Sequence, residues 1–290
     1  MVSAATIPCI APLFVPGDRP DRFARAAASG ADGIIIDLED AVAATAKGRA
    51  RQAVAAATLP GDIPVFLRIN PPRTVWFRDD LALAAALPGI GVMLPKVASV
   101  ADIEAVHQGT GRDRPLIVLL ESAAGIATVR TIATAAGISR LAFGSIDYCA
   151  DLGCTPVREA LLMPRLELVL ASRVAGLAPP LDDVMTGLTD DQALADAARY
   201  AAELGFGGKL CIHPRQIPQV IAGFTPTAQQ LAWAQQVLSL DGNGASVTAA
   251  GQFVDSAVLR RARAIIARYR RVSTMQADAR QGAKDAEGTY

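Results

Sequence analysis

Short apolar runs alternate along the chain with alanine-rich stretches whose apolar positions recur at helical spacing. Runs that are apolar throughout, rather than at every second position, are typical of strands buried on both faces of a parallel sheet. We predict strands at 9–15, 33–38, 65–69, 91–95, 116–121, 140–144, 181–186 and 208–212. Helices are predicted between them, beginning near Pro20, Lys47, Asp79, Val100, Thr128, Met163 and Thr189.

This alternation predicts an α/β fold, and eight strands with seven intervening helices predict a (β/α)8 barrel. An open doubly wound sheet is the alternative, but no predicted strand is followed by the G-x-G-x-x-G of a dinucleotide-binding turn. A helix at 227–240, a glycine-rich loop and a helix at 256–271 follow the last strand. We therefore divide the chain into a barrel (1–225), a C-terminal helical lid extension (226–272) and a polar tail (273–290) that is predicted to be disordered.

The composition excludes several classes of protein. Lys and Arg together number 28, as do Asp and Glu, so no net charge attracts nucleic acid or a membrane surface. No apolar stretch is long enough to span a bilayer, the N-terminus lacks a signal-peptide pattern, and no CxxC pair occurs, which predicts a cytoplasmic protein with buried, inert thiols. The two histidines cannot build a three-imidazole zinc site, and His107 is expected on a solvated helix surface.

Charged side chains follow nearly every predicted strand. In a barrel, the carboxyl ends of the strands share one face, and barrel enzymes build their sites there. This face is predicted to carry five carboxylates, those of Asp37, Glu39, Asp40, Glu121 and Asp147. Such a cluster predicts a bound divalent cation, Mg2+ or Mn2+, because these ions prefer hard oxygen ligands and relieve the repulsion between carboxylates.

Each of these residues also has a purely structural interpretation. Glu121 could pair with Lys96 from the preceding strand, and Asp147 could cap a helix. The carboxylates at 37–40 could be solvated loop charges, and Arg68 could be the structural partner of any of them. Taken singly, the residues leave these alternatives open.

Six blocks are more specific together: "LFVPGDRPDRFARAAASGADGIIIDLEDAV", "LRIN", "MLPKVAS", "LLESAAGI", "LAFGSIDYCADLG" and "GKLCIHPRQI". Their order and spacing resemble the citrate lyase beta subunits, malyl-CoA lyases and citramalyl-CoA lyases of the HpcH/HpaI aldolase superfamily. The resemblance covers about residues 8–270. It implies a TIM barrel that assembles as a homotrimer or as a hexamer.

The resemblance also implies a reaction and roles for the residues. Glu121 and Asp147 match the family's Mg2+ ligands, and Glu39 and Asp40 are candidates for the shell around them. Arg68 matches an arginine that acts on the oxygen where charge develops. The implied reaction is reversible carbon-carbon cleavage of a 3-hydroxyacyl-CoA, of the malyl-, citramalyl- or citryl-CoA type, to an acyl-CoA and a 2-oxo acid.

Further matches concern the proton donor and coenzyme A. Asp255, in "GQFVD", matches an aspartate that a lid of the neighbouring subunit supplies in malyl-CoA lyases, although it could simply cap a helix. Arg19, Lys209 and His213 are candidates for contacts with CoA, and His213 could equally be structural.

Two other functions remain open from the sequence. The chain could be the beta subunit of a multi-component citrate lyase that acts on an acyl-carrier thioester, or a pyruvate-type class II aldolase acting on a hydroxy acid without CoA. The retained "GQFVD" block favours a free-standing CoA enzyme. The sequence does not identify the acyl group, the 2-oxo acid or any hydrolysis of the thioester.

Overall fold

The chain forms an eight-stranded parallel sheet in which each strand pairs with the next one along the sequence. The computed structural model describes residues 9–240, 246–247 and 253–287. The strands are β1 (Leu13–Pro16), β2 (Ile34–Asp37), β3 (Val65–Arg68), β4 (Gly91–Leu94), β5 (Leu116–Leu120), β6 (Ile138–Phe143), β7 (Ala178–Asp182) and β8 (Gly208–Lys209). All eight predicted strands are therefore present, in the predicted order.

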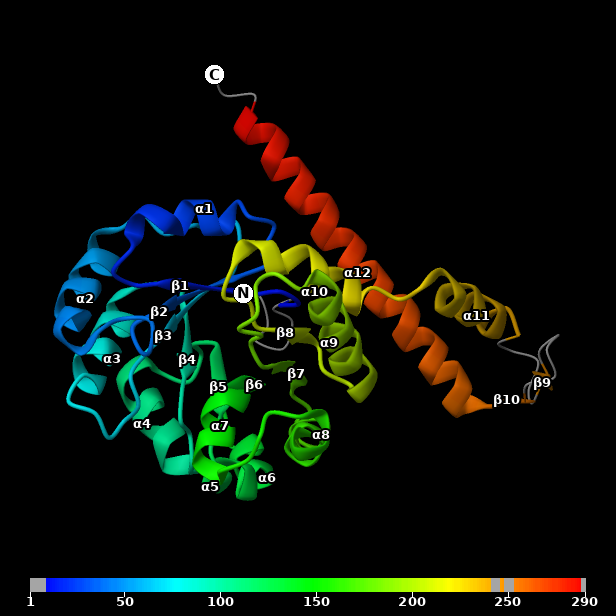
Figure 1. Cartoon of the computed structure of the whole chain (residues 1–290), viewed down its shortest axis with the longest axis horizontal. Helices are drawn as coiled ribbons and strands as arrows, with labels where there is room; N and C mark the ends of the chain where they lie inside the picture. The colour runs from blue at the N-terminus through cyan, green and yellow to red at the C-terminus, as the bar shows by residue number, and fades with distance from the viewer. Residues whose placement is uncertain (1–8, 241–245, 248–252, 288–290) are drawn as a thin grey trace.

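The sheet curls until its first and last strands become neighbours. The backbone N–H of Phe14 donates to the carbonyl of Cys211 at 2.8 Å, and that of Cys211 donates to the carbonyl of Pro12 at 2.9 Å. The N–H of Lys209 donates to the carbonyl of Ile10 at 2.8 Å. Figure 1 shows the strands in the interior of the molecule and the helices outside them.

The strand residues are apolar throughout because both faces of the sheet are buried. One apolar cluster, which includes Ile35, Phe66, Met93 and Ile117, takes alternate residues of successive strands. The intervening residues, such as Ile34, pack in the larger cluster with the helices. Parallel sheets covered on both faces require this two-sided burial.

The helices that follow the strands start and stop at local sequence signals. Ser99 begins the helix Val100–Thr110 (α4) with a capping box, and Asp190 caps the helix Asp191–Leu204 (α9). Gly153 ends the helix Ser145–Leu152 (α7) and Gly205 ends α9, both in the left-handed conformation. The helices around the sheet are α1 (Phe23–Ala27), α2 (Lys47–Ala56), α3 (Phe77–Ala86), α4 (Val100–Thr110), α5 (Ala123–Ala127), α6 (Val129–Ala133), α7 (Ser145–Leu152), α8 (Arg158–Val174), α9 (Asp191–Leu204) and α10 (Ile217–Phe224).

Some predicted boundaries are wrong. Helix α8 begins at Arg158 rather than near Met163. Helix α6 begins at Val129, close to the predicted start at Thr128, but the short helix α5 before it was not predicted. Strand β7 covers 178–182 instead of 181–186, and two prolines, Pro179 and Pro180, lie inside it. Prolines argue against a strand within a sheet because they cannot donate to the ladder. A register shift in the pairing of β6 with β7 coincides with this segment.

The segment after α10 forms a third, smaller apolar cluster. It comprises α11 (Ala228–Leu238), β9 (Ser246–Val247), β10 (Phe253–Val254) and the start of α12 (Ser256–Glu287), with Ala234, Val237 and Val254 among its buried residues. Figure 1 shows β9 and β10 to one side, away from β1–β6. Helix α12 passes the predicted end at 271 and continues through most of the tail that was predicted to be disordered. Most of the glycine-rich loop lies outside the described residues.

His107 is buried, which corrects the expectation of a solvated surface residue. Its Nε2 lies 2.9 Å from the carbonyl oxygen of Ala136, and its ring packs against Gly137. The polar neighbours of His107 in the sequence hid the inward orientation of this side chain. Cys9, Cys149 and Cys211 are buried free thiols, as expected. In the part of the chain that the structure describes, no helix is both long and apolar enough to cross a bilayer.

Candidate functional site

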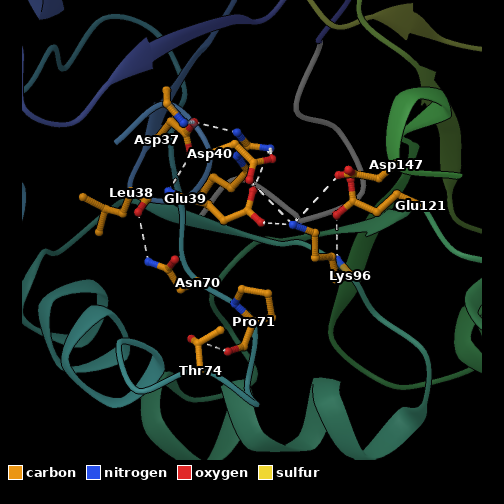
Figure 2. Close-up of polar contacts among 12 residues, drawn as sticks. Asp37, Leu38, Glu39, Asp40, Asn70, Pro71, Thr74, Lys96, Glu121 and Asp147 are labelled. Carbon is orange, nitrogen blue, oxygen red and sulfur yellow. Dashed lines mark hydrogen bonds and ion pairs between the residues drawn. The ribbon is translucent and has the colours of Figure 1, made fainter. Parts of the chain in front are cut away.

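Seven charged side chains gather beyond the carboxyl ends of β2–β5 and at the start of α7. Figure 2 shows Lys96 between Glu39 and Asp40 on one side and Glu121 and Asp147 on the other. The cluster contains all five carboxylates predicted from the sequence together with two cations: Asp37, Glu39, Asp40, Arg68, Lys96, Glu121 and Asp147. The expectation that the strand ends share one charged face is therefore correct.

Asp37 holds Arg68 in a fixed position. The two residues end neighbouring strands and are register partners. Arg68 donates from Nε to Asp37 Oδ1 at 2.7 Å and from Nη2 to Oδ2 at 2.5 Å, which is a two-pronged contact. Burial alone would lower the pKa of Arg68, but the hydrogen bonds and charge of Asp37, with the charge of Glu39, raise it. Arg68 is thus a permanently cationic group in one orientation.

Glu39 lies buried between the two cations. Its Oε2 is 3.1 Å from Arg68 Nη1, and its Oε1 accepts a 2.6 Å hydrogen bond from Lys96 Nζ. The contact with Arg68 is an ion pair without hydrogen-bond geometry, so Oε2 is a buried oxygen without a hydrogen bond. Burial raises the pKa of Glu39 above its usual range although Arg68 and Lys96 oppose the shift. Both carboxylate oxygens of Glu39 are therefore directed at protein cations.

Lys96 connects the two halves of the cluster. Its Nζ lies 3.6 Å from Asp40 Oδ1 and 3.9 Å from Asp147 Oδ2, while its backbone N–H donates to Glu121 Oε1 at 2.8 Å. The φ angle of Lys96 is 54°, in the left-handed region. Lys96 does meet Glu121, as the structural alternative required, but through its backbone, while its ammonium group contacts other carboxylates.

Glu121 and Asp147 lie side by side (Figure 2). Glu121 follows β5 and is buried, whereas Asp147 lies in the first turn of α7 and is partly exposed. Burial, followed by the charges of Glu39 and Asp147, raises the pKa of Glu121 to about 8. Because α7 begins at Ser145, Asp147 is not a helix cap.

Gly144 provides the space for the Glu121 carboxylate. A Cβ atom at position 144 would lie 2.6 Å from Glu121 Oε2 and 2.7 Å from Glu121 Cβ. Real Cβ atoms do not approach other atoms so closely, so a larger residue would displace the carboxylate. Glycine is therefore required between β6 and α7 for Glu121 to adopt this position.

The donor set suits a divalent cation. Five carboxylates face only Arg68 and Lys96 as side-chain cations of the cluster, and the charges of Glu39 and Asp147 add to the effect of burial in raising the pKa of Glu121. Among the described residues, no three side chains of metal-binding type converge on one point. Glu121 and Asp147 would thus supply two oxygen ligands, and water and substrate would supply the others, which is the usual situation for Mg2+.

Neutral and cationic side chains that the sequence reasoning missed hold the 37–40 loop. Lys47 Nζ donates to the carbonyls of Leu38 and Glu39 at 2.8 and 2.9 Å, and Asn70 Nδ2 donates to the carbonyl of Leu38 at 2.9 Å. The ring of Phe14 lies 4.7 Å from the guanidinium carbon of Arg68. Asn70 could have been predicted from the sequence as a residue of this site, because it ends the "LRIN" block.

Lys209 lies in a different place from that expected of a CoA contact. It is fully buried, and its Nζ donates to Asp182 Oδ2 at 3.0 Å and Asp183 Oδ1 at 2.6 Å. Arg165 Nε donates to Asp182 Oδ1 at 2.9 Å, and Ser145 Oγ donates to Asp183. This network supports the first residue of α7, two residues before Asp147. The burial of Lys209 corrects its assignment to the surface that binds CoA.

The remaining candidates lie outside the carboxylate cluster. Arg19 is exposed and pairs with Asp21 at 3.1 Å, and His213 Nδ1 accepts from the backbone N–H of Arg215 at 3.2 Å. Asp255 caps α12, since its Oδ1 accepts from the N–H groups of Ala257 and Val258, both at 2.9 Å. Asp255 follows β10, which Figure 1 shows away from β2–β5 of the same chain.

Comparisons with known proteins agree with this geometry. The family model described as HpcH/HpaI aldolase/citrate lyase matches residues 11–214. A citrate lyase subunit beta-like protein of Deinococcus radiodurans is 36% identical over 276 residues, covering 88% of this chain and 95% of that protein. An L-malyl-CoA/beta-methylmalyl-CoA lyase of Cereibacter sphaeroides is 33% identical, covering 90% of this chain and 94% of that protein.

The fold has solved relatives as well. The crystal structure of CitE from Mycobacterium tuberculosis, in complex with magnesium, acetoacetate and coenzyme A, superposes with a TM-score of 0.82 at 36% identity. The match covers 90% of this chain and 98% of that one. The family model and the similar proteins support the same family assignment. The chain belongs to the HpcH/HpaI aldolase/citrate lyase family.

Proposed function

We propose that this protein is a Mg2+-dependent carbon-carbon lyase that cleaves a 3-hydroxyacyl-CoA of the malyl-, citramalyl- or citryl-CoA type. The products are an acyl-CoA and a 2-oxo acid. The observation that carries the proposal is the adjacent pair of Glu121 and Asp147 (Figure 2) in the same charged cluster as the fixed cation Arg68, whose charge acts on Glu121. The magnesium, acetoacetate and coenzyme A bound by CitE from Mycobacterium tuberculosis, and the malyl-CoA lyase among the relatives, support this choice of substrate.

Each residue of the cluster has a role in this reaction. Glu121 and Asp147 would hold Mg2+, or Mn2+ in its place, and the bound ion would stabilise negative charge on the oxygens of the hydroxy or oxo acid. Arg68, held by Asp37, stabilises the negative oxygen that develops on the acyl-CoA half. Glu39 and Asp40 hold Lys96 and would orient water near the ion.

The proton for the acyl-CoA carbon is assigned to Asp255 of a neighbouring copy. Asp255 follows β10, which lies away from β2–β5 of its own chain in Figure 1, and this placement is compatible with action in a homotrimer or hexamer. The proposal includes a closed (β/α)8 barrel over 1–225 with a C-terminal lid, supported by the hydrogen bonds between residues 209–211 and 10–14. Arg19 and His213 remain the candidates for CoA contacts, and the free thiols favour a reducing cytoplasm.

A cleavage assay tests the proposed function directly. The purified chain is incubated with malyl-CoA, citramalyl-CoA or citryl-CoA, with Mg2+ or with EDTA, and released acyl-CoA, free acid and 2-oxo acid are quantified. We expect acyl-CoA release from at least one thioester that requires Mg2+ and no carrier protein. Strict dependence on an acyl-carrier protein would favour the citrate lyase subunit, and cleavage of only CoA-free hydroxy acids would favour the aldolase.

A pair of variants on one helix separates the metal site from the fold. Asp147→Ala should abolish Mg2+ binding and turnover. Asp151→Ala, one turn further along α7, removes a carboxylate that accepts from the backbone N–H of Ala123 at 2.7 Å and should retain Mg2+ binding. Unchanged activity of Asp147→Ala, or of the wild type in EDTA, contradicts the metal assignment.

A further inference from the structure

Asp147 depends on its helix for its position. Its side chain is 41% exposed, and its Oδ2 lies 3.9 Å from Lys96 Nζ, which is beyond hydrogen-bonding distance. Helix α7 begins two residues before Asp147, after Gly144, which has no side chain to cap the helix. The first turn of a helix is weakly held unless other groups bind it, because its N–H groups lack partners within the helix. A contact at the start of α7 therefore decides where the Asp147 carboxylate lies.

Ser145 supplies this contact. It is the first residue of α7, it is buried, and its Oγ donates a hydrogen bond to the carboxylate of Asp183, which directly follows β7. Successive residues of a helix are rotated by about 100°, so Ser145 and Asp147 point to nearly opposite sides of α7. A bond on the inner side fixes the rotation of α7 about its own axis. The direction of the Asp147 side chain is fixed with it.

Asp183 is itself held firmly. Its Oδ1 accepts from Lys209 Nζ at 2.6 Å, and its Oδ2 accepts from Arg165 Nη2 at 3.3 Å. Both cations also bond to Asp182, Lys209 at 3.0 Å and Arg165 at 2.9 Å. The two positive and two negative charges balance, and all four side chains are buried. Ser145 is thus attached to an anchor built from the end of β7, from β8 and from α8.

The charge state of Asp183 makes Ser145 the donor. Burial alone would raise the pKa of Asp183, but the charges of Lys209 and Arg165 hold it below its usual range. An ionised carboxylate can only accept hydrogen bonds, so the hydroxyl group of Ser145 must donate. Hydrogen bonds to a charged group are about twice as strong as those between neutral groups. The anchor therefore holds the start of α7 more firmly than a neutral acceptor would.

We propose that Ser145 is a positioning residue for the metal site. Its bond to Asp183 keeps the first turn of α7 in the orientation that places Asp147 beside Glu121 (Figure 2). The inference rests on the proposed function, because it requires Asp147 to be a ligand of Mg2+. Through Ser145, the buried network around Lys209 contributes to metal binding although Lys209 itself lies outside the carboxylate cluster.

The other end of α7 is attached separately. Asp151 accepts from the backbone N–H of Ala123 at 2.7 Å, and this bond is exposed to solvent. Asp151 lies one turn beyond Asp147, so loss of its carboxylate leaves the first turn attached through Ser145. The bond from Ser145 to Asp183 is therefore the contact to test.

A second buried serine separates positioning from stability. Ser139 lies near the amino end of β6, and its Oγ accepts from the backbone N–H of Leu116 at 3.1 Å. Ser139→Ala and Ser145→Ala remove the same atom from two buried sites, and each removes a hydrogen bond. In Ser145→Ala, Asp183 keeps its bonds to Lys209 and Arg165, so no buried charge loses its partner. Ser139→Ala is thus the matched control.

The test is calorimetric titration of the full chain with Mg2+. Ser145→Ala should raise the dissociation constant about tenfold, because groups that orient metal ligands typically contribute at least this factor. Ser139→Ala should bind Mg2+ as the wild type does. The EPR spectrum of bound Mn2+ should change in Ser145→Ala and not in Ser139→Ala, because it reports the geometry of the ligands. Urea unfolding should give similar midpoints for the two variants, so a difference in stability does not explain the difference in affinity.

The outcomes distinguish this inference from the proposed function. A wild type that binds no Mg2+ contradicts the metal site and the inference together. A wild type that binds Mg2+ as tightly as folded Ser145→Ala contradicts the inference alone, and so do equal losses of affinity in Ser145→Ala and Ser139→Ala. If Ser145→Ala does not fold, Ser145→Cys, which keeps a weaker donor, must raise the dissociation constant several-fold on its own.

Discussion

The backbone N–H of Lys96 donates a 2.8 Å hydrogen bond to Oε1 of Glu121, and the left-handed φ of 54° at Lys96 accompanies this contact. Lys96 is the one non-glycine residue with positive φ in the described part of the chain. The same residue directs its ammonium group to Glu39, 2.6 Å away. A locally unfavourable backbone conformation at a charged cluster indicates that the surrounding contacts stabilise it.

Replacing Lys96 separates the backbone strain from the ion pairs. Lys96→Ala and Lys96→Gly both remove the ammonium group and keep the N–H that bonds to Glu121. Alanine retains the steric cost of positive φ, whereas glycine does not, so we expect Lys96→Gly to be about 1 kcal/mol more stable than Lys96→Ala. Urea unfolding of the two variants measures the difference. Equal stability would mean that the left-handed conformation at position 96 carries no strain.

The raised pKa of Glu121 predicts that Mg2+ affinity depends on pH. Below a pKa of about 8 the carboxyl group retains its proton, and a protonated carboxyl is a poor ligand. The apparent affinity should therefore increase about tenfold per pH unit below the pKa and level off above it. Calorimetric titration with Mg2+ between pH 6 and 9 measures this, with Glu121→Gln as the variant that should show weak, pH-independent binding. A flat profile for the wild type contradicts the pKa shift.

Gly144→Ala tests the position of the Glu121 carboxylate. The added Cβ would lie 2.6 Å from Oε2, so the carboxylate must move. We expect Mg2+ affinity to fall at least about tenfold while the fold is retained, because ligand geometry is altered. Gly48→Ala is the control, since a Cβ there meets no atom within 4 Å. Similar Mg2+ affinities of the two variants would show that Glu121 does not need this position.

The sequence predicted the strands well because a buried parallel sheet imposes continuous apolar runs such as 34–36. It misplaced the bounds of β7 because Pro179 and Pro180 normally exclude a strand, and a register shift in the pairing of β6 with β7 coincides with them. The direction of a side chain was also hidden. The inward orientation of His107 depends on the rotation of α4 against its neighbours, which polar residues nearby in the sequence do not reveal.

The sequence predicted which residues belong to the charged cluster better than it predicted which of them contact each other. The seven charged residues follow strand ends, and the topology alone brings strand ends together. Which carboxylate each cation contacts depends on register and side-chain length. Asp37 and Arg68 meet as register partners, whereas Lys96 reaches Glu39 with its side chain and Glu121 with its backbone.

The buried position of Lys209 predicts a large effect on stability rather than on CoA binding. Lys209→Met leaves the carboxylates of Asp182 and Asp183 buried without one of their two cations. Breaking a buried ion pair in this way costs about 3–5 kcal/mol. Urea unfolding should show this loss, while the KM for the CoA thioester should change little in the folded fraction. A raised KM with unchanged stability would restore Lys209 to the CoA site.

Asp255 carries two roles that a pair of substitutions distinguishes. Its carboxylate caps α12, and the proposal also makes it the proton donor to a neighbouring copy. Asp255→Ala should lose about 1 kcal/mol of stability through the cap, whereas Asp255→Ser keeps a capping oxygen and most of that stability. Neither variant retains a carboxyl group.

The deciding measurement is therefore exchange of the methyl protons of acetyl-CoA or propionyl-CoA with deuterated solvent. Both Asp255→Ala and Asp255→Ser should lose about 100-fold or more of the exchange rate, because positioned acids and bases contribute at least this factor. Mg2+ affinity should be unchanged in both, since Asp255 follows β10, which Figure 1 shows away from β5 and α7 of the same chain. Restoration of exchange by serine would assign Asp255 to the helix cap alone and exclude it as the proton donor.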